Sequence, residues 1–146
     1  MTVIERSALL PHTAEQVFDL VADIERYPEF LDGCVGAEIH ERGEETVTAT
    51  LRLSRAGISH GFTTCNRMMR PEKIDLTLVD GPFESFSGQW MFRALGDAAC
   101  KTSLRLDFEL SSGLANVAAG KLFDKVALDL VDSVVRRANQ ELEAAT

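Results

Sequence analysis

The chain has 146 residues, of which 45% are hydrophobic, and its formal net charge is −8 at pH 7. This length fits one domain, residues 1–146, whose core can be stable without a metal or a disulfide. The negative charge argues against DNA binding, because contacts with phosphates need clustered Lys and Arg. No apolar run approaches the roughly 20 residues of a membrane-spanning helix, and the N-terminus lacks a signal peptide's basic start and apolar middle. We therefore expect a cytoplasmic protein.

The first third of the chain predicts one strand followed by short helices. Residues 2–10 alternate between apolar and polar side chains, which is typical of a strand. Thr13 begins the sequence T-A-E-Q, a capping box that predicts a helix over residues 14–22. A further short turn of helix is expected at residues 24–26, before Tyr27-Pro28, because a proline disfavours helix at the residue before it.

From Val35 to Leu110 the hydrophobic pattern has a period of two, which indicates β-strands. Short turns separate six runs of alternating residues, at 35–39, 47–53, 58–70, 74–78, 86–92 and 100–110. Strands that are joined by short turns pair antiparallel with their neighbours. We therefore expect a meander of six strands, with the first strand of the chain added at one edge.

The C-terminal segment predicts one long amphipathic helix. The helical pattern begins at Leu114, and the helix is expected to run from about Lys121 to Glu143. Its apolar stripe recurs at steps of three and four residues: Phe123, Ala127, Leu130, Val134, Ala138 and Leu142. Such a helix reaches about 30 Å and needs a broad apolar surface. The expected fold is α+β, with a curved seven-stranded antiparallel sheet wrapped around this helix and one or two short helices after the first strand.

Neither metal binding nor catalysis is predicted from the sequence. Cys34, Cys65 and Cys100 are far apart, form no C-x-x-C pair and are interpreted as reduced thiols. None of the three histidines has the spacing of a metal-ligand motif. The chain also lacks a nucleophile elbow, a phosphate-binding loop and a dinucleotide-binding motif. We therefore expect a protein that is not an enzyme and requires no cofactor.

Three stretches of the sequence together resemble one known family. They are YPEFL with Gly33-Cys34 at residues 27–34, AGIS with FTT at residues 56–64, and VDGPF followed by Gly88 and WMF at residues 79–92. Their order and spacing are similar to those of the START-like family, which includes coenzyme Q-binding proteins and, with greater similarity, bacterial ribosome association toxins. The resemblance covers essentially the whole chain. It implies the helix-grip fold, in agreement with the sheet and helix expected from the pattern.

The alternation places aromatic and a few polar side chains on the inner face of the sheet, which predicts an apolar tunnel for a ligand. The alanines of the helix stripe are small and would underfill the space against the sheet. The resemblance implies a ubiquinone-type isoprenoid lipid as the ligand, bound without chemical change. The predicted ligand-binding residues are Tyr27, Phe30, Phe62, Thr64, Asn66, Phe86, Trp90, Phe92, Phe108 and Val134.

Alternatives stay open for these residues. The aromatic side chains also fit an ordinary packed core. His60, Thr64 and Asn66 are either hydrogen-bonded core groups or anchors that orient a quinone carbonyl. Tyr27 and Phe30 belong either to a plain connection between helix and strand or to a lid at the mouth of the tunnel.

Residues 46–73 are locally basic in an acidic chain. They contain five cations against one acid, whereas residues 1–45 carry eleven acids against three bases. The cations are either the solvated faces of two strands or a site for a partner, and the resemblance implies a ribosomal subunit as that partner. The predicted partner-binding residues are Arg52, Arg55, Arg67, Arg70 and Lys73.

Three functions follow from these observations. The first is non-enzymatic binding of a quinone-type lipid in support of respiration, in the cytoplasm or at the periphery of the inner membrane, with transient contact at the membrane surface. The alternative is a protein that resembles the ribosome association toxins and blocks the association of ribosomal subunits. A second alternative is an enzyme similar to polyketide cyclases and dehydratases, since some helix-grip proteins are enzymes.

Overall fold

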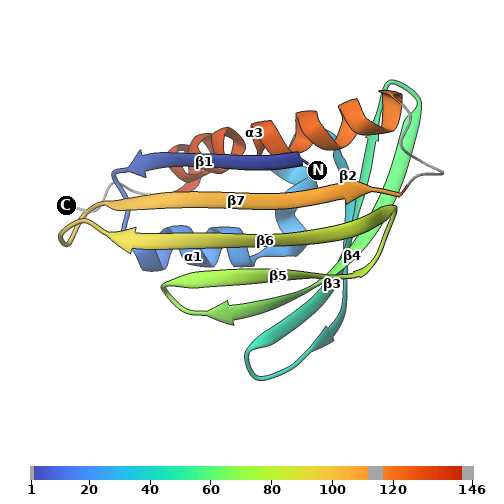
Figure 1. Cartoon of the computed structure of the whole chain (residues 1–146). Helices are drawn as coiled ribbons and strands as arrows, with labels where there is room; N and C mark the ends of the chain where they lie inside the picture. Colours follow the sequence, from blue (N-terminus) through green and yellow to red (C-terminus); the bar gives the residue numbers. More distant parts are fainter. Residues whose placement is uncertain (1, 112–116, 143–146) are drawn as a thin grey trace.

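The computed structural model describes residues 2–111 and 117–142. In chain order its elements are β1 (Thr2–Leu10), α1 (Ala14–Ala22), the 3-10 turn η1 (Ile24–Arg26), α2 (Tyr27–Phe30), β2 (Cys34–Arg42), β3 (Thr46–Arg55), β4 (Ile58–Met69), β5 (Lys73–Asp80), β6 (Phe83–Ala94), β7 (Cys100–Leu110) and α3 (Val117–Glu141) (Figure 1). The predicted start of the helical pattern at Leu114 and the predicted helix end at Glu143 lie outside the described residues.

All seven strands belong to one antiparallel sheet. The strand order is β1-β7-β6-β5-β4-β3-β2, so the six strands after α2 form a meander and β1 pairs with β7. Both features agree with the expectation from the alternating pattern and the short turns. The α+β fold with a curved sheet and a C-terminal helix is therefore confirmed.

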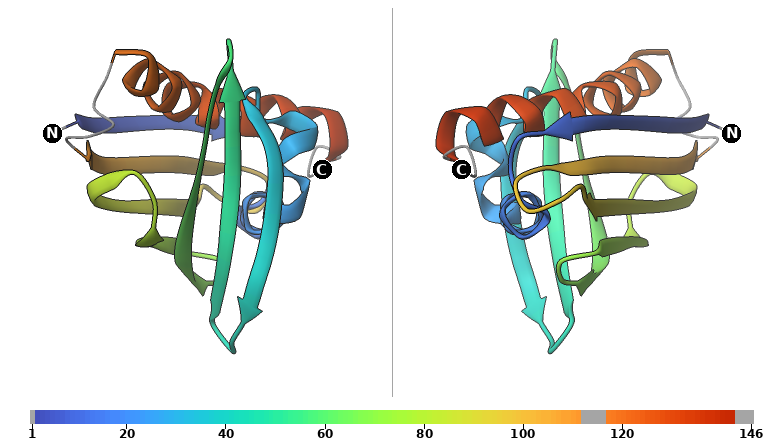
Figure 2. Two further views of the ribbon diagram at one scale, coloured as in Figure 1. Left: turned by 90° about the vertical axis from the view of Figure 1, so that its right-hand side faces the viewer. Right: turned by 90° about the vertical axis from the view of Figure 1, so that its left-hand side faces the viewer.

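The sheet bends strongly, and the helices cover its concave face. Figure 2 shows β2, β3 and β4 running across the direction of β1, β6 and β7. Helix α3 lies beside β1 and extends to β3 and β4, while α1 packs against β6 and β7. The interior between the two halves of the sheet and α3 is therefore enclosed by elements that are far apart in sequence.

Helix α1 begins at the predicted capping box. The Gln16 backbone N–H donates to Thr13 Oγ1 at 3.1 Å, and the Thr13 N–H donates to Gln16 Oε1 at 2.9 Å. Val17 and Val21 on this helix are buried, as predicted. The cap fixes where the chain turns from β1 into the helix, and thus where the segment after α1 meets the core.

Helix α3 presents its small and branched residues to the core. Val126, Val131, Val134 and Ala138 are all buried. Replacing Val134 by alanine should lower the free energy of unfolding by about 1–4 kcal/mol, because the methyl groups removed leave a void in a closed core. Urea unfolding measures this loss. Leu128→Ala, at an exposed position of the same helix, should change stability by less than about 0.5 kcal/mol. If the two variants lost equal stability, the face of α3 that is assigned to the core would be wrong.

Candidate functional site

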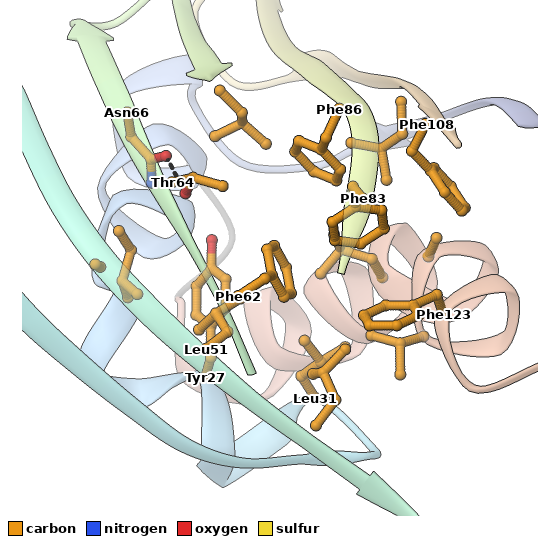
Figure 3. A pocket seen from close by; sticks show the side chains of 18 of the residues that line it. Tyr27, Leu31, Leu51, Phe62, Thr64, Asn66, Phe83, Phe86, Phe108 and Phe123 are labelled. Atoms are coloured by element: carbon orange, nitrogen blue, oxygen red, sulfur yellow. Dashed lines mark hydrogen bonds between the residues drawn. The ribbon is translucent and has the colours of Figure 1, made fainter. Parts of the chain in front are cut away.

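An apolar cavity lies between the concave face of the sheet, α3 and the segment around α2 (Figure 3). Its volume is about 80 Å³. Strands β3 to β7 supply most of the wall, and α3 closes the cavity with Phe123, Val126, Ala127 and Leu130. Ala127, a small residue of the predicted stripe, therefore faces the cavity, whereas the other alanine, Ala138, is fully buried outside its wall.

A cluster of phenylalanine rings fills one end of this space. Phe83 is at its centre, with ring centroids 4.8 Å from Phe123, 5.1 Å from Phe86, 5.7 Å from Phe62 and 5.8 Å from Phe108. Most of these pairs have the edge-to-face geometry that aromatic quadrupoles favour. The rings come from β4, β6, β7 and α3, so the cluster joins both halves of the sheet to the helix.

The opposite end of the cavity carries one polar pair. Thr64 and Asn66 are neighbours on the inner face of β4, and the Thr64 hydroxyl donates to Asn66 Oδ1 at 2.7 Å (Figure 3). Both side chains are buried and line the cavity. Since Asn66 uses its carbonyl oxygen in this bond, its amide N–H groups are the donors available to a bound molecule. The cavity therefore combines a long apolar wall with one hydrogen-bonding position.

Tyr27 also lines the cavity, but its hydroxyl is already engaged. It donates to the carbonyl oxygen of Val21 at 2.5 Å. Burial is the main reason why the pKa of Tyr27 is raised well above its ordinary value, and the nearby Cys34 and Asp23 raise it further. The phenol thus stays neutral in the folded protein and fixes the end of α1 to the segment that follows.

The raised pKa of Tyr27 predicts a loss of stability in alkali. Above about pH 10 the unfolded chain gives up the phenol proton while the folded protein keeps it, so the free energy of unfolding should fall by up to about 1.4 kcal/mol per pH unit. Below that pH the phenol is neutral in both the folded and the unfolded protein, and its full contribution to the free energy of unfolding is present. Tyr27→Phe should remove this part of the slope. Tyr27 is the only tyrosine, so tyrosinate absorbance measured during unfolding reports on it alone; equal slopes for the two proteins would contradict the assignment.

The structure brings most of the predicted ligand-binding residues to this one cavity. Those that line it are Tyr27, Phe62, Thr64, Asn66, Phe86, Trp90 and Phe108. The predicted anchor His60 is half-buried beside the ring of Phe123, with centroids 5.8 Å apart, and is not part of the wall.

Three of the predicted ligand-binding residues lie outside the wall of this cavity. Phe92 is buried, but its ring packs edge-on against Phe18 of α1 at 5.3 Å, so it belongs to the interface between α1 and the sheet. Val134 is fully buried on α3, beyond the stretch of the helix that reaches the cavity. Phe30 packs edge-on against Tyr27, with centroids 5.5 Å apart, and its ring centroid lies 5.4 Å from Cζ of Arg137.

Sequence reasoning missed Phe83 and Phe123, the two closest rings of the phenylalanine cluster. The alternation through Phe86 and Trp90 places Phe83 on the outer face, but the register between β6 and β7 shifts between Phe83 and Ser85 and turns Phe83 inward. The helical pattern places Phe123 in the apolar stripe of the C-terminal helix, but it does not indicate that Phe123 lines the cavity. The G-P-F sequence at residues 81–83 marks the turn before the bulge. It is the one sequence feature that indicates the inward position of Phe83.

The cavity is smaller than the predicted tunnel. Pockets for drug-sized ligands usually measure roughly 300–1,000 Å³, whereas this one measures about 80 Å³. The phenylalanine cluster occupies the space that an isoprenoid tail would need. A long ligand can therefore lie wholly inside the cavity only if rings or the adjoining segment move.

The five predicted partner-binding cations do not form one positive surface. Arg55 lies at the end of the β3–β4 hairpin that contains its turn, whereas Arg67 lies opposite Thr46 at the other end. Four of the cations have carboxylate partners: Arg55 with Asp32 at 3.4 Å, Arg67 with Glu45 at 3.7 Å, Arg70 with Asp19 at 2.8 Å and Lys73 with Asp75 at 4.0 Å. Arg52 is exposed on the outer face. The local excess of positive charge in the sequence is thus largely balanced by acids, three of which lie outside the strand or turn of their cation and one of which, Asp75, lies in the same strand as Lys73.

The three cysteines are free thiols. Within residues 2–111 and 117–142, no group of His, Cys, Asp or Glu side chains is arranged to hold a metal ion. The helices of the same described part include none that combines the length and the apolar character needed to cross a membrane.

A curved antiparallel sheet that grips a long C-terminal helix over an apolar cavity defines a START-like, helix-grip domain. Residues 10–135 match the family described as "Polyketide cyclase / dehydrase and lipid transport", and the chain belongs to this family.

Individual relatives give the more specific similarities. The chain is 46% identical to a ribosome association toxin RatA of Vibrio cholerae over 140 residues, which cover 96% of this chain and 97% of that protein. It is 21% identical to a mitochondrial coenzyme Q-binding protein, COQ10, of Drosophila melanogaster, over 90% of this chain and 56% of that protein.

Solved structures agree with the fold. The Zhui aromatase/cyclase from Streptomyces sp. R1128 superposes with a TM-score of 0.82 at 18% identity, over 98% of this chain and 96% of that one. A START superfamily protein from Mycobacterium smegmatis superposes with a TM-score of 0.79 at 20% identity, over 94% and 97% of the two chains.

Proposed function

We propose that this protein binds a hydrophobic ligand of the isoprenoid-quinone type between the sheet and α3 and releases it chemically unchanged. The observation that carries the proposal is the apolar cavity between the sheet and α3, with a single polar pair, Thr64 and Asn66. A quinone ring presents apolar faces and carbonyl acceptors, which is the complement of this lining. The similarity to a coenzyme Q-binding protein and the family's description as including lipid transport support the same class of ligand.

The ring of such a ligand would lie against the phenylalanine cluster, with one carbonyl accepting a hydrogen bond from the Asn66 amide. Because the cavity measures about 80 Å³, the tail would have to displace side chains or leave the cavity. Apolar burial at about 25 cal/mol per Å² makes a few isoprene units worth several kcal/mol before the ordering costs of binding are subtracted. A longer tail should therefore bind more tightly than a short one.

Two measurements test this proposal. Organic extraction and mass spectrometry of the purified protein should recover a bound quinone. Trp90 lines the cavity and is the only tryptophan, so quinones of increasing tail length should quench its emission with increasing affinity, with Trp90→Phe as the control for light absorbed by the quinone. If no lipid co-purifies and no quenching exceeds that control, the cavity is an ordinary gap in the core.

The lining favours binding over catalysis. Among the described residues of the cavity wall, Tyr27 is the only one with a titratable side chain. Its hydroxyl is held by Val21 and its pKa is raised, so it is a poor acid or base at neutral pH. The cyclase alternative needs an acid–base group beside the substrate. Recovery of an altered quinone or polyketide after incubation would favour that alternative instead.

A second candidate function is ribosome association, as the names of the relatives that share 40–46% of their residues with this chain suggest. Isolated ribosomal subunits should then carry the protein in sedimentation at low salt, and added salt should weaken the association. Charge reversal at Arg52, Arg67 and Arg70 should also weaken the association. Most of this effect should come from Arg52, because the other two already pair with acids. Arg93→Glu, at another exposed position, is the matched control. Sedimentation that is indifferent to salt and to all of these changes excludes an electrostatic site here.

A further inference from the structure

Residues 23–33, here called the lid segment, form the part of the cavity wall that is neither sheet nor long helix. The segment connects α1 to β2 and contains η1 and α2. It contributes Ile24, Tyr27 and Leu31 to the cavity lining. In Figure 3, Tyr27 and Leu31 lie on the side of the cavity opposite Phe86 and Phe108.

Three arginines from three other elements each reach an acid of the lid segment. Arg42 of β2 contacts Glu25 at 3.2 Å, Arg55 of β3 contacts Asp32 at 3.4 Å, and Arg137 of α3 contacts Glu29 at 2.6 Å. The three pairs are distributed along the segment from η1 to the turn before β2. Ion pairs therefore hold it to the sheet on one side and to α3 on the other.

Arg137 is the least exposed of the three arginines. Its side chain is 11% exposed, against 62% for Arg42 and 43% for Arg55. It also contacts Glu141 at 2.8 Å, and its guanidinium covers the ring of Phe30 at 5.4 Å. Exposed pairs are weakened by solvent and salt, whereas a shielded guanidinium with two carboxylates and an aromatic ring is held more strongly. Arg137 is thus the main tie between the lid segment and α3.

The backbone of the lid segment is compatible with movement as a unit. The Arg26 N–H donates to Asp23 and the Leu31 N–H donates to Tyr27, so these bonds stay inside the segment. The Tyr27 hydroxyl bond to Val21 of α1 crosses its boundary and has to break when the segment opens. At its end, Gly33 has a φ of +92°, a conformation that glycine adopts without strain, and its carbonyl accepts from the Ser54 N–H at 2.8 Å. Hinges are usually a few such positions at the ends of elements.

We propose that the lid segment opens and closes over the cavity, with Arg137 as the latch and the Arg42 and Arg55 pairs as weaker, salt-sensitive ties. The inference rests on the proposed function in one respect, because a ligand too large for the closed cavity is what needs the opening. The movement itself can be measured without any ligand. Cys34 is suited to this purpose, since it directly follows the lid segment, is 5% exposed, and has a pKa raised by burial.

The experiment compares thiol labelling by a disulfide reagent in two backgrounds. One retains only Cys34 (Cys65→Ser, Cys100→Ala). The other retains only Cys100, a fully buried thiol in β7, away from the lid segment. Labelling of Cys34 reports opening of the lid segment, and labelling of Cys100 reports global unfolding. Arg137→Gln removes the latch, and Arg70→Gln removes a more exposed arginine–carboxylate pair, with Asp19 of α1, that does not involve the lid segment.

We expect Arg137→Gln to speed the labelling of Cys34 by about tenfold or more, as the loss of a charged hydrogen bond implies, and that of Cys100 by less than about twofold. Arg70→Gln should leave the labelling rate of Cys34 unchanged. Added salt should increase the labelling rate of Cys34 in the parent protein. Equal acceleration of both thiols, or none for Cys34, overturns the lid.

A second readout separates this inference from the proposed function. When the protein is loaded with a quinone, Arg137→Gln should shorten the half-time with which the quinone exchanges into excess detergent micelles. If the parent protein binds no quinone while Cys34 still responds to Arg137→Gln, the proposed function fails and the lid stands. If quinone binds and neither its exchange nor Cys34 labelling responds to the variant, the lid fails and the proposed function stands.

Discussion

Replacement of Phe83 by alanine is expected to lower the free energy of unfolding by about 3–5 kcal/mol. The ring is buried and contacts the rings of Phe62, Phe86, Phe108 and Phe123. Its removal takes away apolar burial and several edge-to-face contacts at once. Because the neighbouring rings belong to strands and to α3, they can collapse into the void only partly.

Guanidinium unfolding followed by Trp90 emission measures this loss, with Phe83→Leu as the matched control that retains most of the volume. Phe83→Leu should cost less than half as much as Phe83→Ala. A small aromatic molecule such as benzene should recover part of the stability of Phe83→Ala by occupying the enlarged cavity. A loss below about 1 kcal/mol would mean that Phe83 is not the centre of the cluster.

The fold could be predicted from the sequence because periodicity encodes it directly. Period-two runs such as residues 100–110 can bury one face only as strands, and the three- and four-residue steps after Phe123 can bury one face only as a helix. Short turns then leave an antiparallel meander as the simple topology. The capping box at Thr13 shows the same correspondence on a local scale, since its two hydrogen bonds join residues three apart.

The candidate site was only partly predictable, for physical reasons that particular residues show. Phe83 faces inward because of a bulge, and a bulge depends on how two strands pair. Phe92 faces the core, but which part of the core depends on the position of α1, which covers it with Phe18. Phe92 follows the alternation and Phe83 departs from it. In both cases tertiary packing decides which residues the ring contacts.

Charge was the least predictable property. Arg55 and Arg70 are close in a cation-rich stretch of sequence, yet each pairs with an acid of a distant segment, Asp32 and Asp19. A count of charges along the chain cannot show such pairs, because they form between elements that only the fold brings together. Arg137 is the clearest example, since its partner Glu29 is 108 residues away.

Replacement of Phe86 by arginine is expected to weaken quinone binding by at least about a hundredfold. Phe86 lies on the inner face of β6, lines the cavity and has its ring 5.1 Å from that of Phe83. A guanidinium there would occupy the ring site of the ligand and would lose hydration among apolar groups. That penalty is several kcal/mol per ion, and about 2.7 kcal/mol corresponds to a hundredfold change in affinity.

The matched control for Phe86→Arg is Met91→Arg, which adds the same charge on the same strand at an exposed position of the outer face. Met91→Arg should bind quinone as the parent protein does, and Phe86→Leu should retain most of the affinity because it keeps the wall apolar. Circular dichroism and Trp90 emission establish that each variant is folded before titration. Because charge and fold are then matched, the position of the arginine is the remaining difference between the two arginine variants. Equal quinone affinity for Phe86→Arg and Met91→Arg would mean that the ligand binds somewhere other than this cavity.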